Sequence, residues 1–206
     1  MQIVIEEPAM SVAVAVQSRG EVILAADSKR TFGSGAMPEG NLRDSKIRKI
    51  GQAYLATTGW GIYTNILDDF IDRRKKLRLT DSQSIFQFFY TLWREMRERY
   101  SMVNDQCSGD ESPFADLDAS FLVANRHGIF YVACDMSVTR FEQYCAIGSG
   151  GSYALGALHA LYKDGADPEK IATRAVEAAS ALDIYCGGPI QIERVSLQSR
   201  RQAGES

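Results

Sequence analysis

The order in which strand-like and helix-like segments follow one another is the feature that most constrains the fold of this chain. Continuous or alternating apolar residues predict strands, and apolar residues three and four positions apart predict helices. The segments run as strands, then helices, then strands, then helices, then a last strand. We expect strands at 11–17, 21–27, 46–50, 53–58, 119–125, 129–134, 138–147 and 190–195, and helices at 60–76, 81–102, 151–165 and 168–182.

Two sheets packed between two layers of helices satisfy this order, because each sheet then buries one face against the other sheet and one against helices. The expected fold is therefore α+β, a four-layer αββα sandwich. With 206 residues, 45% of them hydrophobic, the chain can form one domain with a sizeable core. Asp167 followed by Pro168 predicts the start of the last helix. The helix at 81–102 carries one apolar stripe, formed by Ile85, Phe89, Leu92 and Met96.

The charge of the chain argues against two classes of partner. A formal net charge of −3 gives no reason to expect binding to nucleic acid or to an anionic membrane. The basic run at 73–78 is interpreted as cations at the end of the helix at 60–76. The last carbonyls and the helix dipole stabilise positive charge at that position. No apolar stretch approaches the length of a membrane span. We expect no nucleic acid and no membrane as partner.

The first ten residues do not have the pattern of a secretory signal. They lack a basic start and carry Glu6 and Glu7 inside their apolar run, so we expect a cytoplasmic protein. The cysteines at 107, 134, 145 and 186 have no paired spacing, and the histidines at 127 and 159 stand alone. Neither a disulfide framework nor a zinc site is therefore expected, and no cofactor.

The first predicted hairpin pairs a serine with an aspartate. Two apolar runs flank Ser18-Arg19-Gly20, and a three-residue loop that ends in glycine is typical of a G1-bulge hairpin. With the turn centred on Arg19, Ser11 faces Asp27 across the strand ends, at about 5 Å. A hydroxyl beside a carboxylate at the mouth of two apolar strands indicates an active site. The alternative is a polar pair that merely ends the two strands.

The second predicted hairpin places a lysine at the same kind of strand end. Gly51-Gln52 fits a two-residue turn between the strands at 46–50 and 53–58. In that register Lys46 faces Thr57 and lies close to Gly59.

Five short motifs carry a resemblance to a known family. They are AADS at 25–28, KIRKI at 46–50, TTG at 57–59, AIGSGGSYALGALHALY at 146–162 and DIYCGG at 183–188. Their order and spacing resemble those of proteasome-type subunits across roughly residues 11–195. The AIGSGG segment and the Ile-Tyr pair near the end are similar to the bacterial HslV-type peptidases. The long loop before Lys46 and a serine at the nucleophile position are similar to the bacterial proteasome homologue (BPH) branch.

This resemblance implies an N-terminal-nucleophile hydrolase, in which the first residue of the mature chain is both nucleophile and base. The family's threonine falls on Ser11, its strand-end carboxylate on Asp27 and its lysine on Lys46. The remaining implied positions are the oxyanion-hole amide at Gly59, the supporting serine at Ser149, the second carboxylate at Asp183, and supporting residues at Cys186 and Gly187. Three departures stand out: serine replaces threonine, cysteine replaces a hydroxyl residue at 186, and ten residues precede the nucleophile.

The same chemistry can be argued from the residues. A serine hydroxyl needs an adjacent base, which for an N-terminal serine can be its own α-amino group, with a pKa near 8. The Lys46 ammonium would lower the pKa of that amine by disfavouring a second positive charge, and Asp27 would keep Lys46 charged and aimed. The N–H of Gly59 would stabilise the oxyanion, a contact worth about 3 kcal/mol. Ser149 and Asp183 would orient the amine through hydrogen bonds.

The N-terminal extension decides whether Ser11 can act in this way. Met10 precedes a small residue, the context in which an initiator methionine is removed, so translation from Met10 is one route to a terminal serine. Self-cleavage of a ten-residue propeptide is the other. We divide the chain into an extension at 1–10, a peptidase domain at 11–196 and a mobile polar tail at 197–206. The acidic loop at 103–118 is long enough to suggest either function or disorder.

Other interpretations stay open. Lys46 with Asp27 could be a surface ion pair, Ser149 a helix-entry residue and Asp183 a polar residue that ends a helix. The glycines at 148–151 are a weak phosphate-loop match, because Tyr153 occupies the last position of a G-x-G-x-x-G pattern and no Walker lysine follows. At the level of function, the alternatives are a catalytically silent ring subunit that keeps residues 1–10 and a small-molecule amidohydrolase with an open site.

The resemblance also implies partners. The family's peptidases are homo-oligomers that stack two rings around an enclosed chamber, and their substrates are peptides or unfolded proteins. An ATP-driven AAA+ unfoldase as a further partner is left open by the sequence.

Overall fold

Two antiparallel sheets form the centre of the molecule. The computed structural model describes residues 11–32, 35–36, 41, 44–59, 61–100, 117, 119–163 and 165–198. One sheet has the order β10 (Tyr144–Ile147), β1 (Ala13–Ser18), β2 (Glu21–Ala26) and β11 (Gln191–Ser196). The other has the order β5 (Ile47–Ile50), β6 (Ala53–Gly59), β7 (Ala119–Asn125), β8 (Gly128–Val132) and β9 (Val138–Phe141). Two short strands, β3 (Thr31–Phe32) and β4 (Gly35–Ala36), pair with each other.

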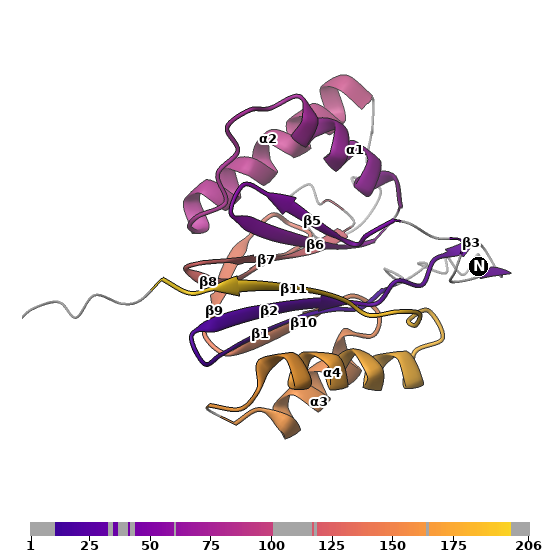
Figure 1. The fold of residues 1–206 in the computed structure, drawn as a ribbon. Helices are drawn as coiled ribbons and strands as arrows, with labels where there is room; N and C mark the ends of the chain where they lie inside the picture. Colours follow the sequence, from indigo (N-terminus) through magenta and orange to yellow (C-terminus); the bar gives the residue numbers. More distant parts are fainter. Residues whose placement is uncertain are drawn as a thin grey trace, which may run out of the picture.

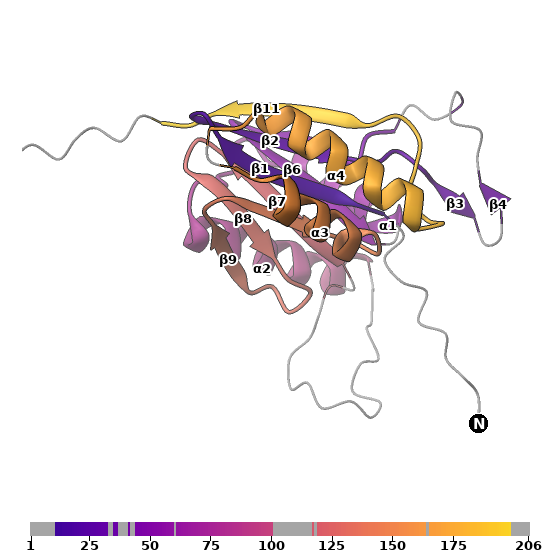
Figure 2. The same ribbon diagram turned by 90° about the horizontal axis from the view of Figure 1, so that it is seen from below.

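Helices cover the outer face of each sheet. Helices α1 (Gly61–Asp72) and α2 (Ser82–Tyr100) pack on the five-stranded sheet, and α3 (Gly151–Leu161) and α4 (Pro168–Leu182) pack on the four-stranded sheet (Figure 1). Seen from below, α4 lies across β1 and β2, and α3 lies beside it over β10 and β1 (Figure 2). The predicted αββα sandwich is confirmed.

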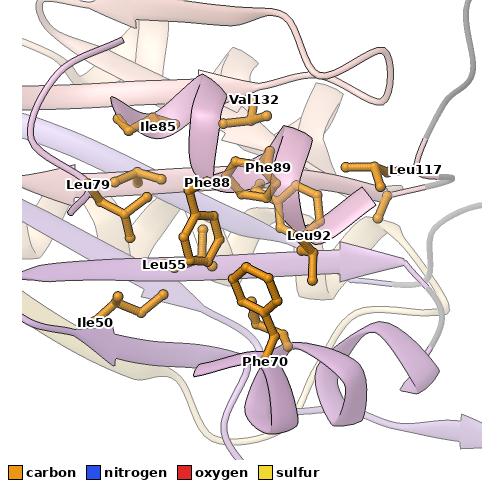
Figure 3. Close-up of a cluster of buried hydrophobic side chains, with 14 of the residues drawn as sticks. Ile50, Leu55, Phe70, Leu79, Ile85, Phe88, Phe89, Leu92, Leu117 and Val132 are labelled. Carbon is orange, nitrogen blue, oxygen red and sulfur yellow. The ribbon is translucent and has the colours of Figure 1, made fainter. Parts of the chain in front are cut away.

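Each of the three interfaces between layers has its own core. Under α1 and α2 the core is rich in aromatic side chains, with Phe70, Phe88 and Phe89 packed edge to face (Figure 3). Under α4 it is rich in alanine, which lets this helix lie close to β1 and β2. Small and branched aliphatic residues fill the space between the two sheets. These cores hold the ends of β1, β2, β5 and β6 in fixed positions relative to one another.

Two helix predictions are confirmed in detail. The predicted stripe of α2 is buried, and α4 begins at Pro168 and ends at Leu182 as expected. Asp167 caps α4, because its carboxylate accepts the backbone N–H groups of Glu169 and Lys170.

Three other element predictions are wrong in their bounds. The helix predicted at 151–165 ends at Leu161, because Tyr162 is extended. The helix predicted at 60–76 ends at Asp72, and the basic run that follows ties α1 to α2: Arg73 pairs with Glu95 at 2.8 Å, and Arg74 stacks on the ring of Phe70. The strand predicted at 138–147 is two strands, β9 and β10, which belong to different sheets. The chain bends at residues 142–143 as it crosses from one sheet to the other.

The register of the first hairpin also differs from the prediction. Ser18 is opposite Glu21, so the loop has two residues, Arg19 and Gly20, and both have a positive φ, 51° and 75°. Such a loop matches the right-handed twist of the strands better than the expected three-residue bulge. As a consequence Val12, and not Ser11, is the residue opposite Asp27: the Asp27 N–H donates to the Val12 carbonyl at 3.2 Å.

The second hairpin has the predicted register. Ile50 is opposite Ala53, and the Thr57 N–H donates to the Lys46 carbonyl at 3.1 Å. Lys46 and Gly59 therefore lie at the same end of β5 and β6.

Several predictions fall outside the described residues: removal of 1–10, almost all of the acidic loop at 103–118, and most of the tail at 197–206. Within the described residues, no helix has the length and apolar character that crossing a membrane requires.

Candidate active site

A buried carboxylate is at the centre of the candidate site. Asp27 follows the last residue of β2 and its side chain is fully buried. Its Oδ1 accepts the backbone N–H of Val12 at 2.9 Å and the ammonium of Lys46 at 2.7 Å. Its Oδ2 accepts the backbone N–H groups of Lys29 at 3.2 Å and Gly187 at 3.1 Å. Four donors from four segments fix the orientation of this carboxylate and compensate for its burial.

Lys46 forms a buried ion pair with Asp27. Its side chain is only 4% exposed, so the interpretation as a surface ion pair is wrong. Burial lowers the pKa of Lys46, the Asp27 carboxylate opposes that shift, and the nearby Arg30 guanidinium adds to it. The backbone N–H of Lys46 donates to the side-chain oxygen of Gln191 at 2.8 Å, which ties β5 to the start of β11.

Ser11 lies against the loop between β10 and α3. Ser11 is buried, and its backbone N–H donates to Oγ of Ser149 at 3.3 Å. Its carbonyl accepts the backbone N–H of Gly150 at 3.3 Å. A Cβ at Gly148 would stand 2.1 Å from the same carbonyl, and φ at this glycine is +92°, so the close approach of the two segments needs glycine.

The end of β6 adjoins this contact. The methyl carbon of Thr58 lies 3.0 Å from the Cβ position of Gly148, which brings β6 next to Ser11. Gly59 is the last residue of β6, with φ of 119°, and α1 begins two residues later. Gly59, the predicted oxyanion residue, therefore directly follows the residue of β6 that packs against Gly148.

The loop after α4 supplies Asp183 and Cys186. The Cys186 thiol donates to Oδ2 of Asp183 at 3.4 Å and lies 4.0 Å from Oγ of Ser149. Burial and then the carboxylates of Asp27 and Asp183 raise the pKa of Cys186 to about 12. The thiol is therefore protonated at neutral pH and is a hydrogen-bond donor, not a nucleophile.

Lys29 is a residue that the sequence reasoning missed. Its backbone N–H and that of Ser28 both donate to the Gly187 carbonyl, at 2.9 and 3.1 Å. Its ammonium donates to the Ile184 carbonyl at 2.5 Å. Lys29 thus joins the end of β2 to the loop that carries Cys186 and Gly187. Its position two residues after Asp27 could have indicated a role in the site. Its partner Ile184 could not be predicted, because it is 155 residues away in the sequence.

The described residues offer no metal site, since no three His, Cys, Asp or Glu side chains among them are grouped suitably. The site instead contains a buried ammonium–carboxylate pair, the hydroxyls of Ser11 and Ser149, and several backbone N–H groups. Such a set suits nucleophilic attack on a carbonyl, with proton transfer by groups held in place.

Comparison with known proteins gives the class. No family model matches the chain. The chain is 27% identical over 191 residues to the ATP-dependent protease subunit HslV of Pseudothermotoga lettingae, covering 90% of this chain and 98% of the relative. It is 25% identical over 185 residues to HslV of Hyphomonas neptunium, covering 89% and 91%.

Solved structures of similar proteins share this fold. Thiobacillus denitrificans BPH superposes with a TM-score of 0.84 at 29% identity, covering 91% of this chain and 99% of that one. A structure of the same protein in complex with epoxomicin gives a TM-score of 0.82. The HslV of Trypanosoma brucei, at 22% identity and a TM-score of 0.60, shares the fold.

The fold is the one found in proteasome-type subunits, and the sequence similarity extends over most of the chain. Within that class the chain is similar to the bacterial HslV subunits and to the bacterial proteasome homologue.

Proposed function

We propose that this chain is a peptidase that cleaves peptide bonds with Ser11 as an N-terminal nucleophile. The observation that carries the proposal is the buried Lys46–Asp27 pair, which is joined to the Ser11 segment through the Val12 N–H. An isolated buried ion pair is costly, so a pair with this many hydrogen bonds at strand ends is a candidate for function.

In the proposed mechanism the Ser11 α-amine, once free, accepts the proton of the Ser11 hydroxyl. The hydroxyl oxygen attacks the substrate carbonyl, and the Gly59 N–H stabilises the oxyanion that forms. Lys46 disfavours protonation of the amine and so keeps it available as a base. Ser149, which accepts from the Ser11 nitrogen at 3.3 Å, orients the amine, and Asp183 with Cys186 supports Ser149.

The proposal includes processing, assembly and location. Ser11 is a base only if residues 1–10 are absent, so we propose that the working chain starts at Ser11, with 11–196 as the peptidase domain. We further propose a cytoplasmic homo-oligomer of two stacked rings that acts on peptides or unfolded proteins. The relatives named ATP-dependent protease subunits support an AAA+ unfoldase as its partner.

The direct test is replacement of Lys46 by methionine in a chain that starts at Ser11. We expect hydrolysis of a fluorogenic peptide to fall by a factor on the order of 10²–10⁴, because the amine loses the group that tunes it. Lys170→Met, on the exposed side of α4, is the matched control and should keep full activity. Unchanged hydrolysis by Lys46→Met, with circular dichroism like that of the parent, would remove Lys46 from the mechanism.

A further inference from the structure

A hollow lies at the other end of the strands from Asp27 and Lys46. It has a volume of about 360 Å³, at the lower end of the range for small-molecule sites. Its walls come from the hairpin of β5 and β6, the turn between β7 and β8, and the end of β11. Since β11 runs from Gln191 beside Lys46 to Ser196 at the hollow, the two places are roughly 15 Å apart.

Cationic side chains line this hollow. Lys49, Arg126 and Arg194 contribute to its walls, and no Asp or Glu does. This is a local excess, because the chain as a whole has a net charge of −3. Like charges in one hollow repel one another, and an anion placed among them would relieve that repulsion.

Among the described residues, Arg194 is the one cation of the three that has carboxylate partners. Arg194 pairs with Glu21 at 2.9 Å and also with Glu169. Across the described part of the chain, neither Lys49 nor Arg126 forms an ion pair. Two full positive charges at the hollow are therefore available to a ligand.

The cations are held in place by their surroundings. The Lys49 ammonium lies 5.5 Å from the centroid of the Tyr54 ring, within the range of a cation–π contact. The Arg126 guanidinium donates through Nε to Nε2 of His127 at 3.2 Å, and the Arg126 carbonyl accepts the backbone N–H of Gln198 at 2.8 Å. Ordered cations lose less freedom when they bind an anion.

The chemistry of the walls indicates the ligand. Guanidinium groups bind phosphate in a bidentate manner, and a lysine adds a point charge. The half-buried Tyr54 ring and the buried Val195 add an apolar surface, and Gln52 and Ser196 add neutral polar groups. We propose that this hollow binds a small phosphate-bearing molecule. The proposal does not depend on the chemistry of Ser11, because it concerns a separate end of the fold.

Calorimetric titration of the full chain with pyrophosphate tests the proposal. We expect saturable binding of one pyrophosphate per chain in 0.15 M salt, and a Kd raised at least about tenfold by Arg126→Gln or by Lys49→Gln. Arg94→Gln is the matched control: it removes one positive charge from an exposed pair on α2 and should leave the Kd unchanged.

Three results would overturn the proposal: no binding, equal weakening by Arg94→Gln, or equally tight binding of citrate. The first removes the site, the second reduces it to general charge attraction, and the third removes its selectivity for phosphate. All three variants alter exposed side chains, and circular dichroism checks that they are folded.

Discussion

At the scale of single residues, the protonation of Lys46 is the property on which the proposed chemistry depends. Burial pulls the pKa of Lys46 down, the contact with Asp27 pushes it up, and Arg30 pulls it down further. The proposed mechanism needs a neutral Ser11 amine and a protonated Lys46. Activity should then rise as pH passes the pKa of the amine and fall as pH passes the lowered pKa of Lys46.

Replacement of Arg30 by glutamine should move the alkaline limb of this profile. The variant removes a cation that lowers the pKa of Lys46, and it leaves Asp44, the 2.7 Å partner of Arg30, without that partner. Removal of that cation raises the pKa of Lys46, so the loss of activity should occur at higher pH than in the parent. The measurement is kcat/KM for a peptide substrate against pH. An alkaline limb that stays in place or moves to lower pH would contradict the assignment of that limb to Lys46.

At the scale of elements, the site is assembled where the ends of several strands meet one loop. The segment after β2 and the loop after α4 are bound to each other by the Gly187 carbonyl, the Gly187 N–H and the Lys29 ammonium. Lys29 is therefore a positioning residue, which acts on the site through the loop and not by contact with the reacting atoms.

Lys29→Met should loosen this connection. We expect kcat for peptide hydrolysis to fall by a factor on the order of 10², because small displacements of catalytic groups are costly, with a nearly unchanged KM. Lys29→Arg should recover most of the loss, since a guanidinium also donates to carbonyls. Lys75→Met is the matched control at an exposed position. A fall in thermal stability without a change in kcat would assign Lys29 a purely structural role.

The elements also show which parts of the fold and site the sequence could predict. The layers, the helix at 168–182 and the second hairpin follow from apolar period, Asp167-Pro168 and Gly51-Gln52, all of which are local signals. The register of the first hairpin does not, because Ser18-Arg19-Gly20 is compatible with a loop of two or three residues. Arg19 takes a positive φ in a hairpin where its Nε donates to the distant Gly165 carbonyl at 2.6 Å.

Some residues of the candidate site could likewise be predicted from the sequence, and others could not. Lys46 and Gly59 could be placed together from the second hairpin, and Ser11 and Asp27 from the first. Ser149, Asp183, Cys186 and Gly187 could be assigned only from the family resemblance. The Val12 contact of Asp27 could not be anticipated, because a one-residue change of register replaces the neighbour across the strand. The expected direct pairing of Ser11 with Asp27 failed for that reason, although both residues still belong to one connected cluster.

At the scale of the whole molecule, large apolar side chains are exposed on the layer of α3 and α4. Tyr153 and Leu155 on α3 are 46% and 47% exposed, and Leu182 and Ile184 at the end of α4 are 62% and 76% exposed. On α1 and α2 the exposed apolar residues Ile62, Phe86 and Tyr90 are 50%, 38% and 40% exposed. Large exposed apolar residues are typical of protein interfaces. The layer of α3 and α4 lies on the opposite side of the sheets from α1 and α2 (Figure 1).

Light scattering coupled to size exclusion should therefore find a homo-oligomer with the mass of two rings. Leu155→Asp should reduce that mass, because a carboxylate would be desolvated at the interface, whereas Arg94→Gln on α2 should not. A parent chain that stays a monomer at micromolar concentration would contradict the proposed compartment and leave a solitary hydrolase.

The central claim is that Ser11, as a chain terminus, provides both nucleophile and base. A peptide epoxyketone tests it directly, because the probe reacts with the hydroxyl and the α-amine of one residue and closes a ring that an internal serine cannot form. Mass spectrometry should find a stable adduct on Ser11 in the chain that starts there, and none in Ser11→Ala or in the chain that keeps residues 1–10. An adduct on any other residue, or equal labelling of the chain that keeps residues 1–10, would contradict the N-terminal serine mechanism.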